Sequence, residues 1–176
     1  MPELAAIPCR APRLPRRFLA PGGLLVIAGP CEVITILGPC VAVTFWCRRS
    51  RVAAICHAML PVAPAGGRPA AGTARWKYVS EAIPEMLTRF IRKGGRPPSL
   101  EIKLFGGADL LHDSASSPAG QIGPRNVQLV RELLAERGLA AIASDVGGHA
   151  GRKLVFNTLT GDVDIKRLPN SAPLLA

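Results

Sequence analysis

Residues 32–58 read EVITILGPCVAVTFWCRRSRVAAICHA, and this stretch decides the fold. It contains three apolar runs rich in Val, Ile and Ala, divided by a Gly-Pro turn and by a polar connection at 47–51. The runs predict strands at residues 32–36, 41–46 and 52–58. The second and third runs are close enough in sequence to be antiparallel neighbours joined by a short loop. Two neighbouring strands therefore carry Cys40 and His57 near their ends.

The residues before and after this stretch predict further strands and two helices. Apolar residues at helical spacing predict one helix over 75–93, which Gly94 and Gly95 end. A second helix is expected over 124–137, with Pro124 at its first position. Further strands are expected at residues 24–27, 99–105, 139–144, 153–157 and 162–168. The elements do not follow a βαβ order, so the expected class is α+β: β-sheets packed as a sandwich with two long helices on the outside, a three-layer α/β sandwich.

At 176 residues the chain predicts a single folded domain of ordinary size. Residues 1–22 are rich in Pro, Ala and Arg and are expected to be a disordered basic arm. The folded domain is expected at 23–169, and residues 170–176 are expected to be a flexible tail. Residues 24–46 are apolar except for Glu32, but Gly-Pro pairs interrupt them and β-branched residues dominate. We interpret them as strands and expect no direct insertion into a membrane.

The formal net charge of +10 and the pI near 10.3 would suit an acidic protein, a nucleic acid or an anionic membrane surface. Aromatic residues make up only 5% of the chain and do not alternate with Lys or Arg, so a platform for stacking bases is not expected. No nucleic-acid partner is therefore predicted. The charge instead favours electrostatic attraction to an acidic protein.

Five cysteines lie in the first third of the chain, an odd number that does not suggest a complete disulfide framework. No Cys-x-x-Cys pair is present and the three histidines are scattered, so we expect no metal site. GxGxxG and P-loop patterns are absent, and no cofactor is expected. These features predict a cytoplasmic protein with reduced thiols. A cysteine in such a protein is usually a small buried apolar residue, and Cys40 departs from that expectation because of its strand-end position and its partner His57.

A thiol and an imidazole at the ends of neighbouring strands are the minimum for thiolate chemistry. The imidazole of His57 can take the proton of Cys40 and stabilise the thiolate as an ion pair. This interaction lowers the cysteine pKa from about 8.5 into a reactive range. The pair therefore predicts hydrolysis or acyl transfer.

Five ordered motifs add a family resemblance. They are Leu37-Gly38-Pro39-Cys40-Val41-Ala42-Val43, His57-Ala58-Met59-Leu60-Pro61, Lys103-Leu104-Phe105-Gly106-Gly107-Ala108, Ile122-Gly123-Pro124-Arg125-Asn126-Val127, and a C-terminal block from Asp145 to Leu168. Together they resemble the CheD family of chemoreceptor glutamine deamidases. The resemblance implies that 23–169 is a CheD-like deamidase domain, a hydrolase that converts receptor Gln side chains to Glu with ammonia release through a Cys thioester. The implied partners are methyl-accepting chemotaxis receptors and the CheC phosphatase.

The resemblance also implies the catalytic residues. Cys40 would be the nucleophile and His57 the base and acid, while in the family a threonine shortly before the cysteine orients the histidine. The hydroxyl available here is that of Thr35, one place later than in the family, where this chain has Ile34. Thr35 is the third catalytic candidate, although a one-place shift turns a strand residue to the opposite face. Pro39 also replaces a serine of the family beside the nucleophile.

Two further pairs of residues are candidates for substrate binding. Gly106 and Gly107 could let a substrate helix approach closely, although a tight turn alone also selects glycine. Arg125 and Asn126 could bind a substrate carboxylate or amide, although the start of a helix also selects polar residues.

Three functions remain open at this point. The leading one is the protein-glutamine amidohydrolase. A second is a non-catalytic adaptor that keeps the fold and binds receptors or the CheC phosphatase, with Ile34 and Pro39 impairing turnover. A third is a methylesterase that uses the same thiolate on receptor glutamyl esters.

We interpret His112 and His149 as solvated loop histidines, and Asp145 as a brace for the glycine turn that follows it.

Overall fold

The computed structural model describes residues 13–64, 76–109 and 121–169. Within these ranges the chain forms nine strands, two α-helices and one short 3₁₀ helix, which fits the α+β class expected from the sequence. The strands are β1 (Arg16–Phe18), β2 (Leu24–Ala28), β3 (Glu32–Leu37), β4 (Val41–Cys47), β5 (Val52–Ala58), β6 (Leu100–Gly106), β7 (Ala143–Val146), β8 (Arg152–Asn157) and β9 (Val163–Arg167). The helices are α1 (Val79–Arg92) and α2 (Ile122–Ala135), and the 3₁₀ helix spans Pro97–Ser99.

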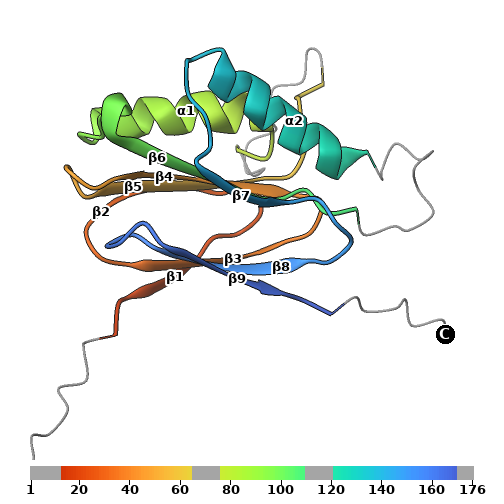
Figure 1. The fold of residues 1–176 in the computed structure, drawn as a ribbon, viewed down its shortest axis with the longest axis horizontal. Helices are drawn as coiled ribbons and strands as arrows, with labels where there is room; N and C mark the ends of the chain where they lie inside the picture. Colours follow the sequence, from red (N-terminus) through yellow and green to blue (C-terminus); the bar gives the residue numbers. More distant parts are fainter. Residues whose placement is uncertain (1–12, 65–75, 110–120, 170–176) are drawn as a thin grey trace, which may run out of the picture.

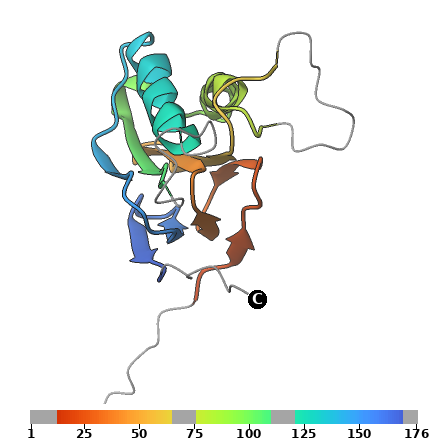
Figure 2. The same ribbon diagram turned by 90° about the vertical axis from the view of Figure 1, so that its right-hand side faces the viewer.

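The strands form two mixed sheets. The five-stranded sheet has the order β2-β5-β4-β6-β7, with β7 parallel to β6 and the other neighbours antiparallel. The four-stranded sheet has the order β1-β3-β8-β9, in which β1 runs parallel to β3. Figure 1 shows both helices on one side of the five-stranded sheet and the four-stranded sheet on its other side. The view turned by 90° shows again that α1 and α2 share one side (Figure 2).

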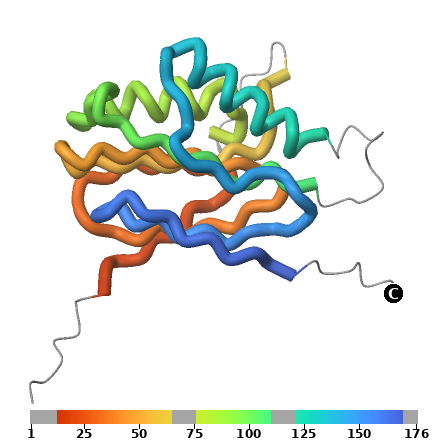
Figure 3. Tube along the Cα trace, in the orientation of Figure 1, coloured from red at the N-terminus to blue at the C-terminus, as the bar shows by residue number. Residues whose placement is uncertain are grey.

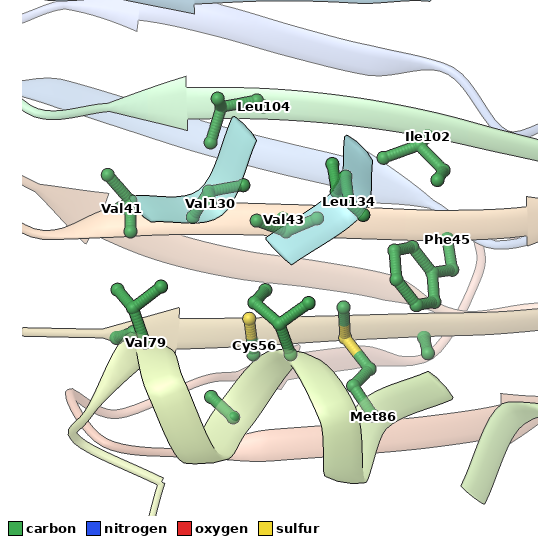
Figure 4. Close-up of a cluster of buried hydrophobic side chains, with 14 of the residues drawn as sticks. Val41, Val43, Phe45, Cys56, Val79, Met86, Ile102, Leu104, Val130 and Leu134 are labelled. Atoms are coloured by element: carbon green, nitrogen blue, oxygen red, sulfur yellow. The ribbon is translucent and has the colours of Figure 1, made fainter. Parts of the chain in front are cut away.

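The central strands β4 and β5 are buried along their whole length because both faces of their sheet are covered. Side chains of β4 alternate between two clusters. Val43 and Phe45 pack against the helices, while Ala42 and Trp46 pack toward the four-stranded sheet. Figure 4 shows the helix-facing cluster, in which Met86 of α1 lies against the strands. This alternation determines which side chains reach the layer between the two sheets.

The prediction of a disordered arm at residues 1–22 is wrong for the last part of that range. β1 pairs with β3, and the buried Leu19 donates its N–H to the carbonyl oxygen of Ile34 at 2.8 Å. The edge of β3 offers unpaired backbone groups, so a short segment can form strand hydrogen bonds there despite a composition that is poor in strand formers. Residues 1–12 and 170–176 lie outside the described residues.

The helices and the last strands are shifted from their predicted bounds by a few residues. The first helix begins at Val79 rather than at residue 75, and the strand expected at 139–144 is β7 at Ala143–Val146.

Figure 3 shows that the N-terminal end of α2 lies at the same end of the molecule as the end of β5, away from the turn between β4 and β5. That end therefore brings the start of β4, the end of β5 and the start of α2 together.

Candidate active site

Cys40 immediately precedes β4, and His57 is the penultimate residue of β5. In the register of these strands His57 faces Ala42, so Cys40 is displaced from His57 by one same-face position along the neighbouring strand. Cys40 packs against the cluster between the two sheets. His57 is only 1% exposed, and strand alternation puts it on the same face as Ile55 of that cluster. The structure therefore brings the thiol and the imidazole onto one face of the sheet.

A hydrogen bond joins His57 to Thr35 of β3 across the layer between the sheets. The Thr35 Oγ1 lies 2.8 Å from His57 Nδ1 and 2.8 Å from the carbonyl oxygen of Leu19. A hydroxyl has one proton and a carbonyl only accepts, so Thr35 donates to Leu19 and accepts from Nδ1–H. His57 thus carries its proton on Nδ1, and Nε2 has the free lone pair. Nε2 is buried without a hydrogen-bond partner among the described residues, so it is the nitrogen that can take a proton.

The one-place shift between Ile34 and Thr35 does not take the hydroxyl away from the histidine. Along β3 the alternate residues Val33, Thr35 and Leu37 are buried, whereas Ile36 is 51% exposed. Ile34 shares the outer face with Ile36. The buried face is turned toward the five-stranded sheet, and Thr35 is the residue of that face that meets the ring.

Burial controls the protonation of the pair. It lowers the pKa of His57 to about 4, against a smaller opposing effect of the Leu19 backbone. Burial also raises the pKa of the Cys40 thiol, and the backbone N–H of Cys40 offsets this rise only in part. No hydrogen bond joins Cys40 to His57 Nε2 within the described ranges. Both groups are neutral near pH 7, so the expected ion pair and lowered thiol pKa are wrong for this structure, because a buried charge without a close partner is costly.

Iodoacetamide should therefore alkylate Cys40 slowly near neutral pH and faster as the pH rises. Only the thiolate reacts, and its fraction grows about tenfold per pH unit below the pKa, so the rate should still be climbing near about pH 9. Cys31 and Cys56 should react more slowly than Cys40, because both are buried and burial raises the pKa of Cys56 to about 12. Peptide mass spectrometry gives the rate at each cysteine. A plateau already reached near pH 7 would contradict the neutral pair.

Gly106 and Gly107 each lie in close contact with another segment of the protein. Both are buried, with φ values of 101° and 65° that favour glycine. A Cβ on Gly106 would collide with the Cys40 carbonyl, and one on Gly107 would collide with the Val127 side chain and the Gly123 carbonyl. The Gly107 N–H also donates to the Cys40 carbonyl at 2.8 Å. Gly106 thus lets β6 lie against the nucleophile segment, and Gly107 lets α2 lie close to the end of β6. The approach of a substrate helix to these glycines stays a prediction.

The two residues of the second predicted substrate-binding pair, Arg125 and Asn126, point in different directions from α2. Arg125 is exposed in the first turn of α2, where a substrate can reach it. Asn126 is 0% exposed, and its Nδ2 donates to the carbonyl oxygens of Pro39 at 3.1 Å and Met59 at 3.0 Å. Its donors are used inside the protein, so the prediction that Asn126 contacts the substrate is wrong.

Arg152 is a buried cation that the sequence reasoning did not single out. Its guanidinium donates to Asp145 Oδ1 at 2.9 Å and to the Gly147 carbonyl at 2.6 Å. Arg167 donates to the same carboxylate at 3.0 Å. Asp145 thus braces the glycine turn through Arg152, which confirms its structural interpretation. The available signal was the alternation of β8, in which Arg152 shares the buried face with Leu154.

The remaining sequence expectations concern histidines, metals and membranes. His149 is exposed, and its Nδ1 lies 3.1 Å from the Asp109 carbonyl oxygen, as for a loop histidine. His112 lies outside the described residues. In the part of the chain that the structure describes, no group of three His, Cys, Asp or Glu side chains is placed to bind a metal ion. The helices in those ranges are also too short or too polar to cross a membrane.

Comparison with known proteins shows the family to which the chain belongs. The family model CheD, described as chemotactic sensory transduction, matches residues 59–167. The probable chemoreceptor glutamine deamidase CheD 2 of Geobacter sulfurreducens is 45% identical over 159 residues, which cover 90% of this chain and 94% of the relative. The probable chemoreceptor glutamine deamidases CheD of Oleidesulfovibrio alaskensis and Trichlorobacter lovleyi are 41% and 42% identical, and the alignments cover 93% and 85% of this chain and 77% and 89% of theirs. The chain therefore belongs to the CheD family.

Proposed function

We propose that this chain is a chemoreceptor glutamine deamidase, a protein-glutamine glutaminase that converts glutamine side chains of methyl-accepting chemotaxis receptors to glutamate. Similar proteins carry this activity in their names. The observation that carries the proposal is the free lone pair of His57 Nε2, which the hydrogen bond to Thr35 leaves unprotonated on the face shared with Cys40. A thiol near a neutral base is the arrangement that amide cleavage through a thioester requires.

The first half of the reaction forms the thioester. His57 Nε2 takes the Cys40 proton as Sγ attacks the carboxamide carbon, and the carbonyl oxygen becomes an oxyanion. We propose that the backbone N–H of Cys40, which belongs to the same residue as the sulfur, stabilises that oxyanion. The C–N bond then breaks, and Nε2–H gives its proton to the leaving nitrogen, which departs as ammonia. Because both groups start neutral, the proton moves while the S–C bond forms.

The second half hydrolyses the thioester. Nε2 takes a proton from water as the water oxygen attacks the acyl carbon, and a second oxyanion forms at the same carbonyl oxygen. The C–S bond breaks, the sulfur regains its proton from Nε2–H, and the side chain leaves as glutamate. Thr35 accepts from Nδ1–H in both halves. The same nitrogen, Nε2, is therefore base and acid throughout.

Ammonia release from a purified cytoplasmic fragment of a chemoreceptor tests this function. We expect ammonia in proportion to the glutamines converted, with mass spectrometry of receptor peptides recording the change from amide to acid at each site. Methanol released from a methylated receptor in place of ammonia would instead indicate a methylesterase. Receptor binding without release of either product would indicate the adaptor, which the names of the relatives do not favour.

The finer partner and location assignments remain proposals. We propose the CheC phosphatase as a second partner, on the basis of the family resemblance, and the cytoplasm as the location. Cys31, Cys40, Cys47 and Cys56 are free thiols, which supports a reducing compartment. Among the predicted substrate-binding residues, Arg125 is exposed on α2, and we propose that a receptor contacts it directly.

The proposal extends to the finer fold description, a three-layer α/β sandwich. It is supported by two clusters of buried side chains, one between the helices and the five-stranded sheet and the other between the two sheets. Cys40 packs against the second cluster, and Thr35 reaches His57 across it. We therefore propose that the catalytic residues lie in the cluster between the two sheets.

Thr35→Val should lower kcat at least about tenfold, a loss of about 1.4 kcal/mol of transition-state stabilisation, whereas Thr35→Ser should largely keep it. Valine matches threonine in size but has no oxygen to accept from Nδ1–H, so the ring loses both its orientation and its tautomer. Ammonia release by the two variants, measured in parallel, gives the comparison. Ile34→Thr should not rescue Thr35→Val, because position 34 lies on the outer face of β3. A Thr35→Val protein with wild-type kcat would show that Cys40 and His57 work as a dyad.

A further inference from the structure

Asn126 is buried at the start of α2, and its side chain is held by two main-chain carbonyls. Nδ2 donates to Pro39 at 3.1 Å and to Met59 at 3.0 Å. Both partners can only accept, so the NH₂ group faces them and the amide orientation is fixed. Oδ1 is buried and has no hydrogen-bond partner within the described ranges. A buried acceptor without a partner is destabilising, so the two bonds that accompany it are expected to have a function.

The two carbonyls belong to the segments that carry the reacting groups. Pro39 directly precedes Cys40, and Met59 follows His57 by two residues. The pairing of β4 with β5 ends at Val41 and Ala58, so Pro39 and Met59 lie just beyond it. Asn126 therefore joins the nucleophile segment to the histidine strand at the point where the sheet pairing stops.

The bond to Pro39 also fixes the direction of the Cys40 N–H. The peptide that links Pro39 to Cys40 is planar, and its C=O and N–H point in opposite directions, so an anchored oxygen anchors the N–H. No hydrogen bond from this N–H to another residue is found among the backbone bonds of the described ranges. Pro39 has no N–H of its own. The Cys40 N–H is thus a backbone donor in the same residue as the attacking sulfur, and it is not used elsewhere in the described backbone.

We propose that Asn126 is a positioning residue for the oxyanion donor: by binding the Pro39 carbonyl, it keeps the Cys40 N–H aimed at the oxygen that becomes negative when the thiol attacks. This inference rests on the proposed deamidase function. Asn126 is buried and acts through the Pro39–Cys40 peptide rather than on the substrate. An oxyanion donor stabilises the transition state more than the bound substrate, so loss of the anchor lowers kcat and leaves KM nearly unchanged.

The variant Asn126→Leu keeps the size of the side chain and removes both donors. We expect kcat for ammonia release from the chemoreceptor fragment to fall about tenfold to a hundredfold, because the donor is misdirected rather than deleted. KM should stay within about twofold of the wild-type value. Alkylation of Cys40 by iodoacetamide forms no oxyanion, so its rate should stay within about threefold. Buried Cys56 should remain unlabelled, which excludes a general loosening of the sheet.

Val130→Ala is the matched control, because Val130 lies on the same helix and packs in the helix-facing core. It should lose stability and keep wild-type kcat. If Asn126→Leu does not fold, Asn126→Ala provides the same comparison. A wild-type kcat in the Asn126 variant, an equal loss in Val130→Ala, or a parallel loss of Cys40 alkylation would overturn the inference. A wild-type protein that releases no ammonia would overturn the proposed function itself, and this inference with it.

Discussion

Cys40→Ala should abolish ammonia release from the chemoreceptor fragment, a loss of at least about four orders of magnitude in kcat. Without the sulfur no atom can form the thioester, and His57 has no thiol proton to take. The protein should still fold, because Cys40 is only partly buried and the change removes a single heavy atom. Ammonia release and thermal unfolding of the wild-type and variant proteins, measured side by side, check both expectations.

Cys31→Ala provides the control for this result. Cys31 is buried in the cluster between the sheets, so its replacement removes the same atom from a more enclosed position. We expect it to cost more stability than Cys40→Ala and to leave kcat unchanged. Turnover by Cys40→Ala, or equal inactivation by Cys31→Ala, would contradict Cys40 as the nucleophile.

His57→Gln should lower kcat by about two to four orders of magnitude. Glutamine can still bind near Thr35, but its amide has no lone pair basic enough to take the thiol proton. At high pH the solvent forms the thiolate without a base from the protein, so alkylation of Cys40 near about pH 9 should persist in the variant. That result separates the loss of a base from the loss of the fold. An unchanged kcat would leave His57 as a packing residue.

The burial of His57 also determines the acid side of the wild-type pH profile. Its pKa is lowered to about 4, so the imidazole is neutral above that pH and can accept a proton. Below about pH 4 the added proton occupies Nε2, and kcat/KM should fall. Measured profiles should therefore be flat between about pH 5 and 7. A fall centred on the ordinary histidine value of 6.5 would contradict a buried neutral ring.

Strand periodicity explains which parts of the site could be predicted from the sequence. The apolar runs predicted two neighbouring strands, with Cys40 near the start of one and His57 near the end of the other. Because side chains alternate along a strand, the register of β4 and β5 places both residues on one face of the sheet. Periodicity along β3 leaves open which of its faces meets the second sheet. The choice between Ile34 and Thr35 depends on how the two sheets stack, and only the folded structure resolves it.

The features that escaped prediction depend on long-range packing. β1 has the composition of a disordered arm, and its pairing with β3 compensates for that composition. Asn126 is polar at a helix start, and its inward direction follows from the way α2 lies over the ends of β4 and β5. Gly106 could be predicted to need a glycine conformation, but the Cys40 carbonyl that approaches it is distant in sequence. The raised thiol pKa depends on burial, which the motif alone does not specify.

The chain of hydrogen bonds that orients His57 ends on the main-chain carbonyl of Leu19. Every amino acid at position 19 supplies that oxygen, so this last link is insensitive to point mutation in a way that a side-chain acceptor is not. The hydrogen bond would instead be lost if the backbone at residue 19 moved. The short pairing of β1 with β3 keeps that backbone in position. The segment that contains β1 and Leu19 thus supplies the acceptor at the end of the hydrogen bonds that orient His57.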